Sequence, residues 1–280
     1  MLVTLNDVLL DAKKNHYAVG LFNTVNLEMA KGVIGAAEEA KSPVIIGTAE
    51  VLLPAASLMD LAPMLRDMAQ KASVPVVLHF DHGLTEEKIF LAMELGFSSI
   101  MYDCSSGSFE DNIQKVSAMV KTAHARGITV EGELGHVGAN GEDGEAENDQ
   151  SIYTDPQDAR RYALETGVDA LAVAIGTAHG AYKKKPKLDL LRLSEIASIV
   201  DTPLVLHGGS GLSDEDFKNT IVRGIAKVNI FTDLNVAAAK AAHDQWREGI
   251  GFTDVMPHIA EAVKQETLKK MRLFGSVGKA

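Results

Sequence analysis

Eight short apolar runs recur along the chain, and most are followed by a segment with the spacing of an amphipathic helix. Near-continuous apolar runs of this length are typical of parallel strands covered on both faces. Eight strand–helix units in 280 residues predict an α/β fold, a (β/α)8 TIM barrel that spans residues 1–280 as a single domain. A doubly wound sheet is the alternative, and it usually has fewer strands. The eight runs are YAVGLFN (17–23), PVIIGT (43–48), PVVLHFD (75–81), SSIMYD (98–103), ITVEGEL (128–134), DALAVAIG (169–176), PLVLHG (203–208) and AKVNIFT (226–232).

The segments between these runs carry the start and stop signals of helices. Residues 108–127 begin with Ser and end with Gly, and residues 154–167 have Pro in the first turn and a closing Gly, as helix ends commonly do. Residues 56–72 repeat apolar side chains at helical spacing. Two further helical segments, 237–246 and 258–275, predict a C-terminal helical extension of the barrel.

Composition limits the classes of partner. The net charge of −11 disfavours nucleic acid and anionic membranes, and no apolar segment has the length of a transmembrane helix. Residues 1–16 do not resemble a signal peptide. A lone cysteine, Cys104, suits a reducing compartment, and we assign it no role. We therefore expect a cytoplasmic protein with neither a nucleic-acid nor a membrane partner.

Three histidines stand at the carboxyl ends of three predicted strands. His82 closes HFDH, His179 lies in IGTAHG, and His207 begins HGGSG. The carboxyl ends of barrel strands meet at one mouth, and three imidazoles leave an open coordination position on Zn²⁺. The alternative, that each histidine is an ordinary satisfied polar residue, is weaker for three in register than for one. The sequence therefore predicts a zinc site.

A glycine-rich segment at the end of the seventh run predicts an anion site. In HGGSG (207–211) the glycines let backbone N–H groups approach a ligand, and Ser210 adds a hydroxyl. Asn229 and Thr232 add donors near the end of the eighth run. The loops after strands 7 and 8 of such barrels commonly bind phosphate. A flexible turn is the alternative reading of GGSG.

Carboxylates accompany the three histidines. Asp81 precedes His82 and is a candidate general base, although it could instead orient a neighbouring histidine. Asp103 and Glu133 end the next two runs and either hold a second cation, accept hydrogen bonds, or are simple rim carboxylates. His79 has the same facing as Asp81 but lies two residues deeper, so we expect it to be a buried supporting group.

Five segments together resemble the class II, metal-dependent ketose-bisphosphate aldolases, and most of all the tagatose-bisphosphate aldolase branch with its sugar-phosphate relatives. The resemblance runs from about Phe22 to Phe274. It implies a zinc-dependent enzyme that reversibly cleaves a ketose 1-phosphate or 1,6-bisphosphate, of tagatose or fructose type, to dihydroxyacetone phosphate and an aldehyde through a metal-stabilised enediolate. The segments are FDHG, ELGHVG, AVAIGTAHGAY, PLVLHGGSG and KVNIFTDL.

The resemblance also implies residue roles. Asp81 matches the proton-transfer carboxylate, and Glu142 in the long segment 135–155 resembles a mobile acid that aids proton transfer. Asp103 and Glu133 match an accessory cation site. The zinc ligands are His82, His179 and His207, and the substrate- and phosphate-binding residues are Asn23, Gly180, Lys183, Gly208, Gly209, Ser210, Asn229, Ile230, Phe231 and Thr232.

Further expectations follow from the same resemblance. A monovalent cation, Na⁺ or K⁺, is expected near the phosphate, and the assembly is expected to be a homodimer or homotetramer. Lys183 lies in KKKPK and could equally belong to a solvated charge run. Phe231 stands where one fructose branch has Asp, which leaves the substrate contacts at that position open.

Three rival functions use similar parts. A metal-dependent sugar-phosphate epimerase or isomerase would not release a triose phosphate, and a non-catalytic sugar-phosphate-binding barrel would bind without turnover. A Schiff-base aldolase needs a lysine at the mouth, whereas Lys227 is expected to lie deeper than Asn229 on the same strand. The segment GTAEVLLPA (47–55) offers few charges for a second phosphate, so a singly phosphorylated substrate is compatible with the sequence.

Overall fold

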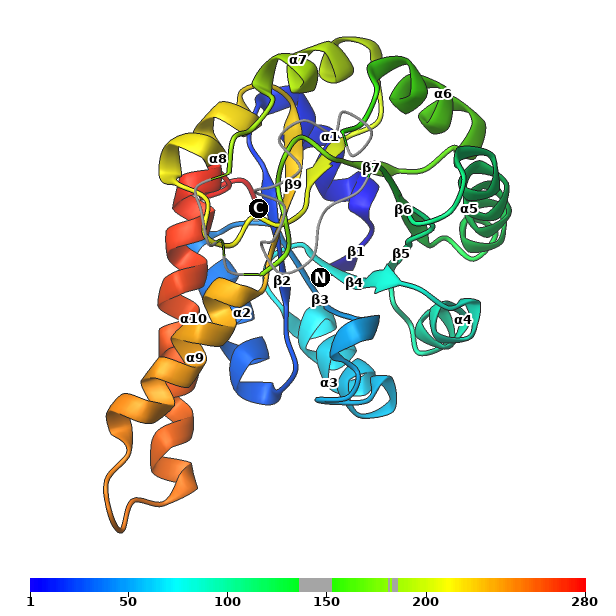
Figure 1. Ribbon diagram of the computed structural model, residues 1–280. Coiled ribbons are helices and arrows are strands. Elements are labelled where there is room, and N and C mark those ends of the chain that lie inside the picture. Colours follow the sequence, from blue (N-terminus) through cyan, green and yellow to red (C-terminus); the bar gives the residue numbers. More distant parts are fainter. Residues whose placement is uncertain (136–152, 181, 183–185) are drawn as a thin grey trace.

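Eight parallel strands close into a barrel that is surrounded by helices (Figure 1). The computed structural model describes residues 1–135, 153–180, 182 and 186–280. Pairing between β4 and β5 closes the ring, which confirms the predicted (β/α)8 fold. The barrel strands are β2 (Val19–Asn23), β3 (Val44–Ala49), β4 (Val76–Gly83), β5 (Ser99–Tyr102), β6 (Thr129–Leu134), β7 (Ala170–Val173), β8 (Leu204–Leu206) and β9 (Ile225–Ile230).

The helices of the outer layer follow the strands in order, as the periodic segments predict. Several strands are shorter than the apolar runs, so His207 follows β8 and Thr232 begins the helix after β9. The helices between the strands are α2 (Leu27–Ala40), the 3-10 turn η1 (Glu50–Leu52), α3 (Leu58–Lys71), α4 (Glu86–Glu94), α5 (Phe109–His124), α6 (Pro156–Thr166), α7 (Leu190–Ile199) and α8 (Asp214–Ile221).

Two elements at the N-terminus close the barrel end opposite the strand carboxyl ends. The short strand β1 (Leu2–Val3) pairs with the first residues of β4. Helix α1 (Leu5–Asn15) buries Leu5 and Leu9 in a cluster that includes the inward-facing Val77. Neither element was anticipated from the sequence. Because α1 fills this end, a ligand has to enter at the other one.

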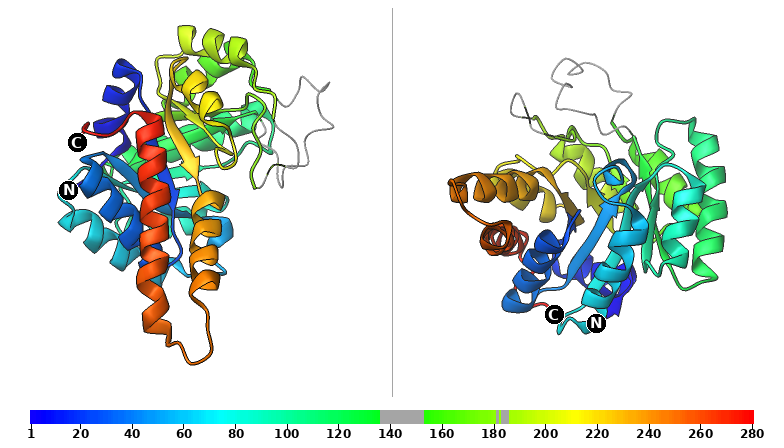
Figure 2. Two further views of the ribbon diagram at one scale, coloured as in Figure 1. Left: turned by 90° about the vertical axis from the view of Figure 1, so that its left-hand side faces the viewer. Right: turned by 90° about the horizontal axis from the view of Figure 1, so that it is seen from below.

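The predicted C-terminal extension is confirmed as a pair of long helices, α9 (Thr232–Gln245) and α10 (Phe252–Phe274). Helix α10 packs along α2 and α9, and the far ends of α9 and α10 project beyond the barrel (Figure 2). No helix in the described part of the chain has the length and apolarity to cross a membrane.

Strand β4 carries the alternation that positions the site. Val76, Leu78 and Phe80 pack in the cluster against the helices, whereas Val77 belongs to the cluster inside the barrel. His79 and Asp81 continue the inward series, as the period of two requires. Strand β3 lies so close to β4 that a Cβ at Gly47 would stand 1.8 Å from the His79 carbonyl oxygen. Only glycine permits this approach.

Candidate active site

A cleft of about 520 Å³ opens at the carboxyl ends of the strands. Its lining includes every sequence-predicted site residue that the structure describes except the fully buried His207. Glu142 and Lys183 lie outside the described residues, so their roles stay predictions. The predicted residues that line the cleft are Asn23, Asp81, His82, Asp103, Glu133, His179, Gly180, Gly208, Gly209, Ser210, Asn229, Ile230, Phe231 and Thr232.

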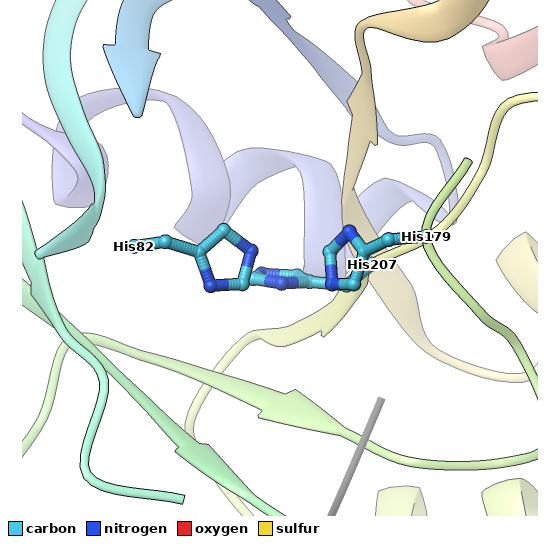
Figure 3. A group of neighbouring side chains, drawn as sticks. All are labelled: His82, His179 and His207. Carbon is cyan, nitrogen blue, oxygen red and sulfur yellow. The ribbon is translucent and has the colours of Figure 1, made fainter. Parts of the chain in front are cut away.

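The three predicted metal ligands come together at the mouth of the barrel (Figure 3). The ring centroid of His82 lies 4.6 Å from that of His207 and 4.8 Å from that of His179. The rings of His179 and His207 are 5.8 Å apart. One ring nitrogen from each residue lies within 4.8 Å of the other two. The rings therefore face a common centre.

In His82 and His207, one ring nitrogen pairs with a carboxylate and the other makes no hydrogen bond to a described residue. His82 Nδ1 lies 2.9 Å from Asp103 Oδ2, and His207 Nε2 lies 2.8 Å from Glu131 Oε1. The other ring nitrogens of these residues are His82 Nε2 and His207 Nδ1. Both are buried, and neither makes a hydrogen bond to any described residue. Metal-bound histidines commonly donate their second nitrogen to a carboxylate. The donor set therefore fits a Zn²⁺ ion held by three imidazoles.

His82 reaches the mouth because β4 is irregular at its end. Strict alternation would turn His82 outward, away from the inward-facing Asp81. The β4–β5 register shifts between Phe80 and Gly83, and His82 has a φ of 42°. A left-handed conformation is uncommon for a residue other than glycine and clusters at functional sites. The bulge thus brings two consecutive side chains to one site.

Asp81 is held as an ionised carboxylate between two amides. Its Oδ2 accepts a 2.7 Å hydrogen bond from Asn23 Nδ2, and its Oδ1 accepts a 3.0 Å bond from Asn229 Nδ2. Burial raises the pKa of Asp81, but His82 and Lys227 outweigh this and leave the pKa well below its usual range. Asp103, and not Asp81, pairs with His82. This arrangement favours the proton-acceptor role over the orienting role.

His79 lies beneath Asp81 and is fully buried. Its Nδ1 is 2.7 Å from Ser99 Oγ, and its Nε2 is 3.8 Å from Asp81 Oδ1. Burial and the nearby Lys227 lower the pKa of His79 to about 4, so the ring is neutral near pH 7. Its position matches the expectation of a buried supporting group.

Asp103 and Glu133 flank the histidines from β5 and β6. One oxygen of Asp103 accepts hydrogen bonds from the Ser105 backbone and hydroxyl, and the other pairs with His82. Burial raises the pKa of Glu133, whose Oε2 lies 3.3 Å from His207 Nδ1. Both oxygens of Asp103 are thus in use. This favours orientation of His82 as its role, and the accessory cation stays a prediction.

The loops after β8 and β9 meet at the start of α9. Ser210 Oγ accepts hydrogen bonds from the N–H groups of Phe231 and Asp233, both 3.3 Å long. A Cβ at Gly209 would lie 2.9 Å from the Asn229 carbonyl oxygen, so glycine allows these loops to touch. Backbone N–H groups at a helix start bind anions well. The predicted phosphate residues Gly208–Ser210 and Asn229–Thr232 therefore lie side by side, and their role in phosphate binding stays a prediction.

Three residues contact the site in ways that the sequence did not indicate. Tyr182 Oη accepts a 2.9 Å bond from Ala178 N and donates a 2.8 Å bond to Gly208 O, which links the loops after β7 and β8. Glu131 orients His207, and Lys227, considered in sequence only as a Schiff-base lysine, pairs with Glu131. Glu131 lies two residues before Glu133, so strand alternation predicts that both side chains face the barrel interior. The sequence carries no comparable signal for Tyr182.

The fold and the histidine-lined cleft are those of a barrel with a candidate metal centre at its mouth, and comparison with known proteins identifies the class. The family model "Fructose-bisphosphate aldolase class-II" matches residues 3–279. The chain belongs to this family and is a class II aldolase, a carbon–carbon lyase. This confirms the resemblance seen in the sequence, while its placement in the tagatose branch stays a prediction.

Individual relatives cover all or nearly all of the chain. The uncharacterized protein YdjI of Escherichia coli K12 is 45% identical over 274 residues, 96% of both chains. A fructose-bisphosphate aldolase of Geobacillus stearothermophilus is 39% identical over 290 residues, which cover 100% of this chain and 99% of the relative. The crystal structure of the YdjI aldolase superposes with a TM-score of 0.89 at 41% identity, covering 100% of both chains.

Proposed function

We propose that the protein is a zinc-dependent aldolase that reversibly cleaves a ketose phosphate of tagatose or fructose type to dihydroxyacetone phosphate and an aldehyde. The observation that carries the proposal is a pair of buried ring nitrogens, His82 Nε2 and His207 Nδ1, that make no hydrogen bond to a described residue and lie near the ionised Asp81. His82, His179 and His207 would hold the ion, which when bound would polarise the substrate carbonyl as a Lewis acid.

The side chains of this protein supply the proton transfer and the positioning. In cleavage, Asp81 takes the proton of the C4 hydroxyl, C4 becomes the aldehyde carbon as the C3–C4 bond breaks, and the electron pair of that bond moves to C3. The protonated Asp81 then returns its proton to C3. In synthesis, Asp81 removes a C3 proton from dihydroxyacetone phosphate. Asn23 and Asn229 aim the carboxylate by donating to its two oxygens. The loops of Gly208–Ser210 and Asn229–Thr232 hold the phosphate.

The far wall of the cleft favours a substrate with one phosphate. Val51, Leu52 and Leu84 line it, and no lysine or arginine is among the lining residues in the described part of the chain. The neighbouring Glu50 uses its carboxylate to accept hydrogen bonds from the backbone of Leu84 and from Thr85. A second phosphate against this apolar wall would lose its hydration without gaining hydrogen bonds, which is unfavourable in free energy. We therefore favour ketose 1-phosphates over 1,6-bisphosphates.

A substrate panel tests the proposal. Ketose 1-phosphates and 1,6-bisphosphates are incubated with the zinc-loaded enzyme, and dihydroxyacetone phosphate is measured by coupled reduction. Release is expected, with a higher kcat/KM for the monophosphates. Formation of an epimer or isomer without any triose phosphate would instead identify an epimerase, and binding without turnover would identify a sugar-phosphate sensor. A preference for bisphosphates would refute only the inference that the apolar wall selects substrates with one phosphate, and the aldolase proposal would stand.

Ser210→Ala tests phosphate binding by the loops after β8 and β9. The Ser210 oxygen accepts two N–H bonds, so its own proton is free to donate to a phosphate. Losing such a bond to a charged group costs roughly 1.5–3 kcal/mol, so KM for the phosphorylated substrate should rise about tenfold or more, with kcat changed less. Steady-state kinetics measures both. Ser198→Ala on α7, whose hydroxyl bonds only its own helix backbone among the described residues, is the matched control; equal KM values in the two variants would exclude Ser210 from phosphate binding.

A further inference from the structure

A buried ion pair lies beneath the site, and the mechanism described above assigns it neither a proton transfer nor a substrate contact. Lys227 Nζ on β9 is 2.8 Å from Glu131 Oε2 on β6, and neither side chain has any exposed surface. Removing two charges from water is costly, and apolar residues of similar volume are often no less stable in such places. Stability alone therefore gives little reason for a lysine inside the barrel.

The second contact of Lys227 shows what the ammonium group controls. Nζ donates to Asn229 Oδ1 at 2.6 Å. A lysine ammonium has three donors and no acceptor, so the Asn229 atom that faces it must be the amide oxygen. The amide nitrogen then points the other way, toward Asp81 Oδ1 at 3.0 Å. A reversed amide would place its N–H groups against the ammonium and its oxygen against the carboxylate.

We propose that Lys227 is a positioning residue that fixes the amide of Asn229 so that its nitrogen donates to Asp81. Glu131 on β6 anchors the ammonium with one carboxylate oxygen, and its other oxygen pairs with His207. Without the ammonium, both orientations of the Asn229 amide become accessible, and the carboxylate loses one of its two side-chain donors. The orientation of the Asn229 amide does not depend on the substrate, whereas the effect of that orientation on turnover rests on the proposed function.

Direct chemistry by Lys227 does not fit its surroundings. The side chain is fully buried and is absent from the lining of the cleft, so a substrate carbonyl cannot reach Nζ to form a Schiff base. Glu131 Oε2 lies 2.8 Å from Nζ and Asn229 Oδ1 lies 2.6 Å from it, and these two contacts hold the ammonium in place. Lys227 therefore affects Asp81 through the amide of Asn229 and through its own charge, which lowers the pKa of Asp81.

The first test observes the amide without using activity. The side-chain ¹⁵N–H₂ signals of Asn229 are identified in the full-length protein by their loss in Asn229→Ala. In Lys227→Met, which keeps the chain length but removes the donors, these signals are expected to shift or broaden. In Lys13→Met, whose lysine contacts the backbone of Val200 and Asp201, they should stay unchanged. Unshifted signals in Lys227→Met would overturn the inference, whatever the substrate proves to be.

The second test is a double-mutant cycle on the zinc-loaded enzyme. Lys227→Met is expected to lower kcat by about tenfold to a hundredfold, as for loss of a hydrogen bond to a charged group. The exchange of the dihydroxyacetone phosphate C3 hydrogen with solvent should slow by the same factor, and KM should change less than about threefold. In the Asn229→Ala background the same change should lower kcat less than about threefold. Fully multiplying effects would show a general structural role and overturn the proposal.

A paired variant guards against misfolding, because Lys227→Met leaves Glu131 charged and buried. Lys227→Met/Glu131→Gln removes both charges, and the Gln oxygen can still accept from His207. Its kcat is compared with that of Glu131→Gln, which retains Lys227. A further fall in kcat with equal zinc content supports the proposal, and equal kcat values contradict it. If the wild-type protein releases no triose phosphate, the proposed function fails, and the amide signals still decide the orientation.

Discussion

Removal of divalent metal is expected to abolish carbon–carbon cleavage, and added Zn²⁺ is expected to restore it. Lewis-acid stabilisation at developing charge is worth several kcal/mol, and each ~1.4 kcal/mol is a factor of ten in rate, so the loss should be at least about 10³-fold. The protein is treated with a chelator, its zinc content is determined by mass spectrometry of the metal, and cleavage is assayed before and after zinc is returned. Full activity in the chelated, metal-free protein would exclude the zinc mechanism.

His82→Ala should have the same effect by removing a ligand instead of the ion. His82 Nε2 is buried and unpartnered by any described residue, so its loss leaves two histidines at the centre, and zinc content and turnover should fall together. The chain offers a close control in His124, which pairs with Asp169 at 2.8 Å on the outside of the barrel, much as His82 pairs with Asp103 at 2.9 Å. His124→Ala should retain both zinc and activity.

The barrel could be predicted because its strands have distinctive compositions. All six residues of β3 are buried, and such strands stand out as apolar runs without polar alternation. Helix α1 was overlooked although its start carries a signal. Thr4 and Asp7 form a capping box, with the Thr4 backbone donating to Asp7 at 2.8 Å. A capping residue followed three positions later by an acid, just before apolar residues, is a helix start.

The site residues were predictable where position along a strand was sufficient. His207 directly follows β8, and His179 lies in the segment that follows β7, so their place at the mouth required only the fold. His82 was placed there without the feature that turns it inward, because a bulge depends on the pairing of β4 with β5 and is invisible in one strand. Strict alternation would have assigned His82 to the outer face of the barrel.

The network under the site could not be read from local pattern. Glu131 and Lys227 lie on strands far apart in the sequence, and only barrel closure brings their charges to 2.8 Å. Each residue alone looks like an unfavourable charge in an apolar strand. The alternation of Glu131 with Glu133, and of Lys227 with Asn229, shows the facing of each side chain. The alternation does not show that Glu131 and Lys227 meet. In this network Lys227 orients the amide of Asn229, and Glu131 orients the ring of His207.

Asp81→Ala is expected to abolish turnover while zinc remains bound, which separates the proton acceptor from the metal ligands. Asp81 is 2% exposed and its pKa lies well below the usual range, so it is ionised throughout the neutral range and available to accept a proton. General-base catalysis contributes roughly 10²–10⁴ in rate, and kcat should fall by that factor. Solvent exchange of the C3 hydrogen of dihydroxyacetone phosphate should fall equally, because both processes need the same carboxylate.

His79→Ala is the matched comparison for both Asp81 and His82. His79 lies on the same strand and is fully buried, and its Nδ1 is hydrogen-bonded to Ser99 Oγ. Its loss removes packing beneath Asp81, and we expect a reduced melting temperature with zinc retained and kcat lowered less than tenfold. The three variants thus predict three patterns: zinc and turnover both lost in His82→Ala, turnover alone lost in Asp81→Ala, and both largely kept in His79→Ala. Loss of zinc from His79→Ala with zinc retained by His82→Ala would mean that the deeper histidine is the ligand, and the ring geometry at the mouth would then need another explanation.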